Sequence, residues 1–246
     1  KTVVAIARRN VPADCWLTAG VNAESSLEAA RLAADAQAAG ANALLVFPPN
    51  GWALYHDLGM ALAHHAYVMQ ASELPIVLYQ APVGAGRMAY QGPVLAVLIA
   101  NPRVAAIKEG SWEVATYEQN WRLVKDKRPD IAVMGSGDEH LLTSYLIGSD
   151  GAQVSLAAVV PEAIVALHEA ATSGAWERAR EIHERIYLLS VAIYRMPPAN
   201  RAAARLKACL KIRGRLDCDA VRPPIAPPTR NEYMQLKQAL KTGHWL

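Results

Sequence analysis

Six short apolar runs recur along the chain, and their starts lie roughly thirty residues apart, about the length of one strand-and-helix unit in a (β/α) barrel. The runs are residues 15–19, 43–47, 75–79, 104–108, 131–134 and 152–155. Alanine-rich stretches between them, such as 26–39 and 54–69, have apolar residues at helical spacing. Strands that are apolar throughout and alternate with helices are typical of a parallel sheet with both faces covered.

A closed barrel fits this pattern better than an open doubly wound sheet, because the period is even and polar residues follow successive strands. A complete barrel has eight strands, and six are found here. Residues 1–9 resemble the last turns of a helix, and there is no initiator methionine. We therefore predict an α/β fold, a (β/α)8 TIM barrel of which this chain holds about six of eight units and lacks the first two. A natural six-stranded open sheet is the alternative.

After the last apolar run the chain becomes helical, over residues 161–169, 174–195 and 200–212. The proline-rich stretch Arg222–Pro228 can be neither helix nor central strand, so it predicts an extended connector before a final helix over 231–242. This is more helix than one barrel unit needs. We predict a partial-barrel catalytic domain at residues 1–160 and C-terminal helices packed on it at residues 161–246.

Composition excludes several classes of protein. The 246 residues are 52% hydrophobic with a formal net charge of +3, which suits one domain with a large core. The basic residues form no stripe with interleaved aromatics, so nucleic-acid binding is not supported, whereas small anionic substrates stay open. No apolar run approaches the ~20 residues of a membrane span, and no signal peptide opens the chain. Three cysteines without metal-ligand spacing suit a reduced, cytoplasmic location.

Lys108 ends one of the apolar runs, directly before Glu109 and Gly110. A lysine at the mouth of a parallel sheet, with apolar neighbours, is placed to lose its proton and attack a carbonyl carbon. A free ammonium has a pKa of ~10.4, and lowering it by about three units costs roughly 4 kcal/mol. Desolvation at a strand end can supply this, so we predict that Lys108 forms a Schiff base. An ordinary lysine that extends to water is the alternative.

Tyr79 ends the preceding run, so its strand end should lie beside that of Lys108. A phenol there can carry protons to and from a carbinolamine and an imine. A tyrosine that only packs beneath a loop is the alternative. Adjacent residues on a strand point to opposite faces, so Glu109 is expected to face the helix layer and is a poor candidate for the base.

A glycine-rich acidic segment follows the next strand: Gly135, Ser136, Gly137, Asp138 and Glu139. A helix is expected to begin near His140, so Asp138 either caps it, with Glu139 favoured by the helix dipole, or both accept hydrogen bonds from substrate hydroxyls. Two carboxylates there would repel a phosphate, which disfavours sugar phosphates as substrates. Ser155, at the end of the sixth run, is the weakest candidate for this substrate-binding region.

The histidine pair His64 and His65 falls inside a predicted helix without a third ligand at helical spacing. We therefore predict surface side chains and no metal site. We also predict that the chain needs no cofactor.

Several segments match the motifs of one protein family in order and spacing: Leu78–Pro82, Ala106–Glu109, Gly135–Asp138, Gly148–Gly151 and Arg222–Pro227. Together they resemble the dihydrodipicolinate synthase and N-acetylneuraminate lyase family over nearly the whole chain. The resemblance implies a class I aldolase barrel in which Lys108 forms an imine with pyruvate or another 2-keto acid while Tyr79 shuttles the proton. It also implies a homo-oligomer, tetramer or dimer. The family's first two units carry a carboxylate-binding loop that has no counterpart here.

Departures from the family pattern narrow the expected substrate. True dihydrodipicolinate synthases carry an arginine shortly after the tyrosine and an aromatic pair after the fourth strand. Here those places hold Gly84 and Pro49-Asn50, and Arg87 is displaced toward the next helix. The loop Val83–Gly86 is more similar to that of the lyases and keto-deoxy sugar-acid aldolases. We therefore expect an aldolase acting on a 2-keto acid, sugar-derived ones included.

Three alternative functions stay open. One is a keto-deoxy sugar-acid dehydratase, because Pro48-Pro49 resembles the corresponding segment of that branch of the family. The second is a dihydrodipicolinate synthase, and the third is a barrel that binds a keto acid without catalysis.

Overall fold

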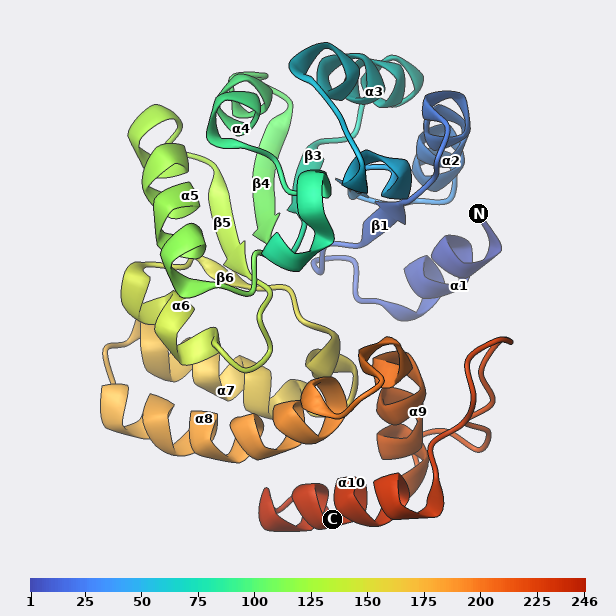
Figure 1. Cartoon of the computed structure of the whole chain (residues 1–246), viewed down its shortest axis with the longest axis vertical. Coiled ribbons are helices and arrows are strands. Elements are labelled where there is room, and N and C mark those ends of the chain that lie inside the picture. Colours follow the sequence, from blue (N-terminus) through green and yellow to red (C-terminus); the bar gives the residue numbers. More distant parts are fainter. The chain divides into compact units, whose positions relative to one another are not determined.

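The computed structural model describes residues 1–246, which form two compact units. The first unit contains Lys1–Ser136 and Gly148–Gly151, and the second contains Gly137–Ile147 and Ala152–Leu246. The first unit is built on a parallel sheet, whereas the second is helical (Figure 1). The division at residue 160 into a catalytic and a helical domain stays a prediction.

The strands of the sheet follow one another in chain order. They are β1 (Thr18–Val21), β2 (Ala43–Val46), β3 (Ile76–Gln80), β4 (Val104–Glu109), β5 (Ala132–Gly135) and β6 (Gly151–Ala152). A doubly wound sheet reverses its strand order at a switch point, so that alternative is wrong. Sequential order is the order of a (β/α) barrel, as predicted. Closure by eight strands stays a prediction.

Helices of the first unit lie in an arc outside the strands (Figure 1). They are α1 (Thr2–Asn10), α2 (Ser26–Ala38), α3 (Leu58–Ala71), α4 (Gly92–Ile99) and α5 (Val114–Lys127), with short turns η1 (Asn50–Ala53) and η2 (Val83–Met88). Alanines at 29, 33 and 36 form the buried stripe of α2. Their small side chains recur at helical spacing, which explains why this stretch folds as a helix on a covered face.

The two faces of the sheet carry different side chains, because successive residues of a strand alternate. One face carries a small buried cluster of Ala43, Leu45, Val77 and Ala106. The opposite face carries larger, fully buried residues such as Leu44, Ile76, Leu78 and Ile107. Tyr79 follows Val77 by two residues and Lys108 follows Ala106 by two, so both continue the face with the small cluster.

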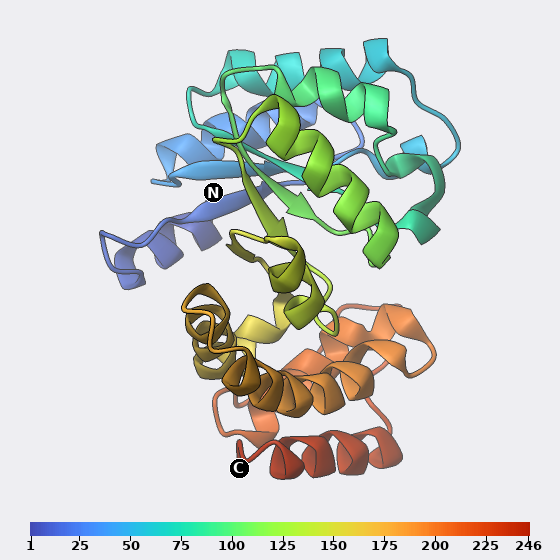
Figure 2. The same cartoon turned by 90° about the vertical axis from the view of Figure 1, so that its left-hand side faces the viewer.

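The second unit is an assembly of helices packed against one another (Figure 2). They are α6 (Leu141–Ile147), η3 (Ser155–Ala158), α7 (Pro161–Thr172), α8 (Trp176–Ser190), η4 (Val191–Arg195), η5 (Ala199–Arg201), α9 (Ala202–Ile212) and α10 (Arg230–Thr242). Leu167, Ile186, Leu236 and Leu240 are among its fully buried residues. The predicted C-terminal helices and the extended connector before α10 are confirmed.

Three of the predicted boundaries were wrong, and at two of them a side chain binds the main chain. The first strand begins at Thr18, since the Asn42 side chain binds the Leu17 amide at 2.8 Å. Helix α3 begins at Leu58, because Asp57 accepts a hydrogen bond from the Met60 amide at 2.8 Å. The sixth strand ends at Ala152. Its expected end, Ser155, instead opens the turn η3.

No helix of the chain combines the length and the apolar composition needed to cross a bilayer.

Candidate active site

Lys108 and Tyr79 are partners in the register of two adjacent parallel strands. The Nζ atom of Lys108 lies 5.6 Å from the centroid of the Tyr79 ring. Both side chains are half-buried. The prediction that these two strand ends are neighbours is confirmed, and the pair presents an amine and a phenol on one face of the sheet.

Apolar groups flank this pair on both sides. The Phe47 ring, directly after β2, lies 4.4 Å from the Tyr79 ring between centroids. Met134 on β5 is the register partner of Lys108. The sequence reasoning missed both residues, although alternation along the strands places each on the same face as the lysine.

Burial raises the pKa of the Tyr79 hydroxyl, and the negative charge of Glu109 raises it further. Tyr79 therefore keeps its proton at neutral pH and is able to donate it.

Glu109 faces the helix layer, as predicted, and is 1% exposed. Its carboxylate accepts hydrogen bonds from the Ser111 hydroxyl at 2.9 Å and from the Asn120 amide of α5 at 2.9 Å. Burial raises the pKa of Glu109, whereas these hydrogen bonds lower it. A carboxylate is thus anchored by neutral donors, through helix α5, on the far side of the strand that carries Lys108.

Gly110, two residues after Lys108, lies where the ends of three strands come together. A Cβ atom there would stand 2.6 Å from the Gln80 carbonyl oxygen and 3.1 Å from the Ser136 hydroxyl oxygen. Only glycine fits such a close approach without movement of the main chain. The same loop holds Trp112 at φ 58°, a strained conformation for a bulky residue. The strand-end Gly is the sequence signal that could have identified this constraint.

The predicted substrate-binding residues divide between the two units, and Gly135 and Ser136 belong to the first. Gly135, the last residue of β5, donates its amide to the Ser149 hydroxyl at 3.1 Å. Ser136 is 5% exposed and donates its amide to the Glu109 carbonyl at 3.2 Å. Its hydroxyl lies near Gly110, so Ser136 is close to the loop that follows the lysine.

In the second unit, Asp138 is held by residues of the same unit. Its Oδ1 accepts hydrogen bonds from the Leu156 amide at 2.8 Å and the Tyr194 hydroxyl at 3.0 Å. Burial raises the pKa of Tyr194, and the charge of Asp138 raises it further. The helix after this segment begins at Leu141, and the carboxylate binds η3 and η4.

Glu139 is also buried, at 4% exposure, and forms two hydrogen bonds with the Arg195 guanidinium, one of them 2.9 Å between Nε and Oε2. The carbonyl of Gly137 accepts the His140 amide at 2.8 Å, which closes the turn before α6. Ser155 is exposed and hydrogen-bonds Tyr194.

The sequence reasoning missed Tyr194 and Arg195. Each lies 56 residues after its carboxylate partner, and no motif links them.

The prediction of surface positions for His64 and His65 is wrong, since they are 1% and 2% exposed. Helix α3 packs both inward: His64 Nδ1 lies 3.0 Å from the Ser26 hydroxyl, and His65 Nδ1 lies 2.8 Å from the Ala61 carbonyl. Burial lowers the pKa of both, that of His65 to about 4. No group of three or more His, Cys, Asp or Glu side chains is arranged to hold a metal ion.

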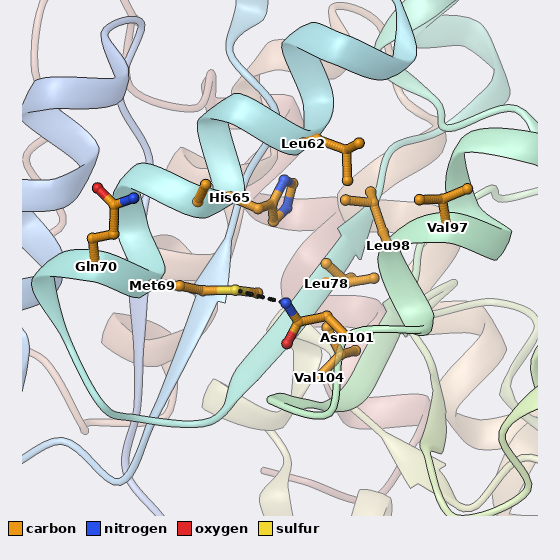
Figure 3. A pocket seen from close by; sticks show the side chains of 10 residues that line it. Leu62, His65, Met69, Gln70, Leu78, Val97, Leu98, Asn101 and Val104 are labelled. Atoms are coloured by element: carbon orange, nitrogen blue, oxygen red, sulfur yellow. Dashed lines mark hydrogen bonds between the residues drawn. The ribbon is translucent and has the colours of Figure 1, made fainter.

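A cavity of about 540 Å³ lies between α3 and α4, lined largely by apolar side chains with Gln70 and Asn101 among them (Figure 3). Leu78 forms part of its wall. Because Leu78 precedes Tyr79 directly on β3, the two side chains point to opposite faces of the sheet. This cavity is therefore behind the sheet and separate from the face of Lys108.

The sequence model that describes the dihydrodipicolinate synthetase family matches residues 1–243 of this chain. The chain belongs to this family, which confirms the resemblance read from its motifs and the expectation of a lyase or aldolase of this family.

Individual relatives support the same placement. An uncharacterized DapA-like lyase of Thermococcus kodakarensis is 24% identical over 234 residues, 95% of this chain and 76% of that protein. A probable 2-dehydro-3-deoxy-D-pentonate aldolase of Escherichia coli K12 is 29% identical over 176 residues, 71% of this chain and 57% of that protein.

Solved structures share the fold. A prophage protein of the dihydrodipicolinic acid synthase family from E. coli K12, solved in complex with pyruvate, has a TM-score of 0.90 at 23% identity. The match covers 100% of this chain and 80% of that one.

Proposed function

We propose that this protein is a Schiff-base-forming aldolase that acts on pyruvate or another 2-keto acid, with Lys108 as nucleophile and Tyr79 as proton carrier. The observation that carries the proposal is their register pairing on β3 and β4, with the amine 5.6 Å from the ring centroid on one face of the sheet. Membership of a lyase family and likeness to a pyruvate-bound structure support it.

The chemistry proceeds in ordinary steps. The Lys108 Nζ attacks the ketone carbon, and the carbinolamine loses water to give an imine. In the cleavage direction the hydroxyl on the departing carbon loses its proton and becomes a carbonyl as the carbon–carbon bond breaks, and the electron pair of that bond moves into the imine to give an enamine. The enamine takes up a proton, and water hydrolyses the imine, which releases the keto acid and restores the Lys108 amine. The Tyr79 hydroxyl, which keeps its proton at neutral pH, donates it to the carbinolamine oxygen, and the phenolate so formed accepts the proton of the departing hydroxyl and returns it to the enamine.

We propose the segment Gly135–Glu139, with Ser155, as the substrate-binding region. Ser136 has the strongest support, because its hydroxyl lies by the loop that follows Lys108. Asp138 and Glu139 accept hydrogen bonds from Tyr194 and Arg195, and within this proposal the remaining lone pairs of their carboxylates accept hydrogen bonds from substrate hydroxyls.

Trapping the imine tests the proposal. The full chain is incubated with pyruvate and borohydride, and the Lys108 peptide is expected to gain the mass of one reduced pyruvate adduct. The matched control is Lys127→Ala, which removes an exposed lysine at the end of α5 and should leave trapping intact. Lys108→Ala should abolish it while circular dichroism shows a retained fold. An adduct spread over many lysines, or none, would end the proposal.

Product analysis separates the alternatives. A dehydratase breaks a carbon–oxygen bond in a keto-deoxy sugar acid, whereas an aldolase releases pyruvate and an aldehyde from it. Unchanged pyruvate binding in Lys108→Ala, without turnover in the parent, would indicate the non-catalytic barrel. The predicted homo-oligomer, dimer or tetramer, is measured by sedimentation velocity.

A further inference from the structure

A second cavity in the first unit lies apart from Lys108, between the residues that follow η1, the turn η2 and the start of α4. It has a volume of about 240 Å³ and is lined by His56, Arg87, Gln91 and Val94. The turns η1 and η2 pack closely at Gly86, which has φ +63° and where an added Cβ would lie 3.1 Å from the Ala53 carbonyl oxygen. This close contact sets the separation of the two turns that border the cavity.

His56 is buried, at 7% exposure, and neither ring nitrogen makes a hydrogen bond of good geometry, although the main-chain carbonyl of Arg87 interacts with the ring. Its ring stacks on Trp52, with centroids 4.9 Å apart, and meets the edge of Tyr90 at 6.0 Å. A buried imidazole without well-formed hydrogen bonds is uncommon in folded proteins. The cavity beside the ring has room for a ligand that can form such a bond.

Two positive features line the same cavity. The Arg87 guanidinium lies 5.5 Å from the centroid of the Tyr55 ring, and it forms no salt bridge within the chain. Helix α4 begins after Gln91 without a side-chain cap, and Pro93 in its first turn has no N–H, so the donors at this end are the amides of Gly92 and Val94 together with the positive end of the dipole. A guanidinium, an imidazole and a helix N-terminus are three groups that bind oxyanions.

We propose that this cavity binds a small oxyanion, the phosphate or carboxylate group of a metabolite, through Arg87, His56 and the N-terminus of α4. The anion supplies a well-placed acceptor for the His56 ring and a counter-charge for Arg87. Burial lowers the pKa of His56, and the charge of Arg87 lowers it further, whereas the Arg87 carbonyl and the charge of Asp57 raise it. The ring is therefore neutral at pH 7 and offers the anion one N–H donor. The site is separate from the chemistry of Lys108 and does not depend on it.

The test is calorimetric titration of the full chain with inorganic phosphate and, separately, with citrate, at constant ionic strength held by chloride. Arg87→Ala should weaken binding about tenfold or more, since it removes a charge-assisted hydrogen bond. The matched control is Arg31→Ala, which removes an exposed arginine of α2 and should leave binding unchanged. Tighter binding of phosphate or of citrate shows which source of oxyanion the cavity prefers.

A second measurement follows the His56 ring itself by NMR. Its imidazole resonances should move on addition of the anion that binds, and His56→Phe, which keeps a ring against Trp52, should weaken binding. Equal affinities for Arg87→Ala and Arg31→Ala would overturn the proposal. So would binding that is lost in Lys108→Ala but kept in Arg87→Ala, because the anion would then occupy the face of the lysine.

Discussion

The two units hold their buried polar groups in different ways. In the first unit, Glu109 is held by the neutral donors Ser111 and Asn120, and the buried histidines of α3 have lowered pKa values. In the second unit, two buried carboxylates are held by arginines: Glu232 pairs with Arg205, which is fully buried, and Glu139 pairs with Arg195. A third, Asp138, has the neutral donors Leu156 and Tyr194, so the second unit adds pairs of opposite charge to neutral contacts of the kind that hold Glu109 in the first.

This difference bears on the proposed chemistry. A carboxylate paired directly with an amine favours the ammonium form, which cannot attack a carbonyl. In the first unit the nearest acid in sequence, Glu109, is turned to the helix layer and anchored by Ser111 and Asn120. The second unit contains no proposed catalytic amine that must stay uncharged. Its arginines pair with carboxylates that would otherwise be buried without a counter-charge. The comparison predicts that loss of a counter-charge destabilises the second unit, whereas in the first unit it is a gained charge, such as a proton on a buried histidine, that destabilises the fold.

The largest expected effect is on the phenol of the first unit. Tyr79→Phe should slow enamine formation about 10²- to 10⁴-fold, the usual contribution of a positioned acid–base group. The ring contact with Phe47 is kept, so the free energy of unfolding should change little. Exchange of the pyruvate methyl protons for deuterium, followed by NMR, measures this step without knowledge of the second substrate. Exchange within twofold of the parent rate would remove Tyr79 from the mechanism.

In the second unit, Arg205→Met should destabilise the fold by about 3–5 kcal/mol, because it leaves Glu232 buried with only part of its counter-charge. Arg205 also donates to the Ile193 and Met196 carbonyls, which would lose their donor. Urea unfolding followed by circular dichroism measures the loss. The control is Arg178→Met, an exposed pair with Glu181, for which a change below about 1 kcal/mol is expected. Equal losses would contradict the contrast between buried and exposed pairs.

Much of the sheet could be predicted because its signals are local. The apolar runs predicted the strands, and the order of consecutive strands predicted that the ends at Tyr79 and Lys108 are neighbours. Alternation along the strand predicted that Glu109 faces the helix layer. Partners of the acidic segment could not be predicted. Asp138 and Glu139 bind residues 56 positions away, and only tertiary packing brings those together.

The error at His64 and His65 has a different cause. The pattern of α3 is apolar on most sides, and histidine fits either a buried or an exposed position in such a helix. The buried position depends on a specific partner from another element, the Ser26 hydroxyl for His64 and the Tyr90 hydroxyl, 3.4 Å away, for His65. Neither contact has a sequence signature.

Those histidines predict acid sensitivity in the first unit. The pKa of His65 is lowered to about 4 in the folded state from about 6.5 when unfolded, so the unfolded chain takes up the proton more readily. Stability is therefore full above pH ~6.5 and falls as the pH drops toward ~4, by about 3 kcal/mol. Urea midpoints between pH 7.5 and 4.5 measure it. His65→Gln should lose less stability between these two pH values, and His64 accounts for the loss that is left. If the stability of His65→Gln depended on pH as steeply as that of the parent, His65 would not be the group that takes up the proton.

The smallest expected effect concerns Gly110, where the first unit depends on close packing and not on charge. Gly110→Ala places a methyl group 2.6 Å from the Gln80 carbonyl oxygen and 3.7 Å from the edge of the Tyr79 ring. Overpacking of this kind should cost about 1–3 kcal/mol in unfolding free energy. It should also slow proton exchange of pyruvate, because the phenol shifts relative to Lys108. Gly84→Ala is the matched control, since nothing lies within 4 Å of its Cβ, and it should change stability by less than about 0.5 kcal/mol. If Gly110→Ala lost stability but kept the parent exchange rate, the position of the Tyr79 ring would not limit the reaction.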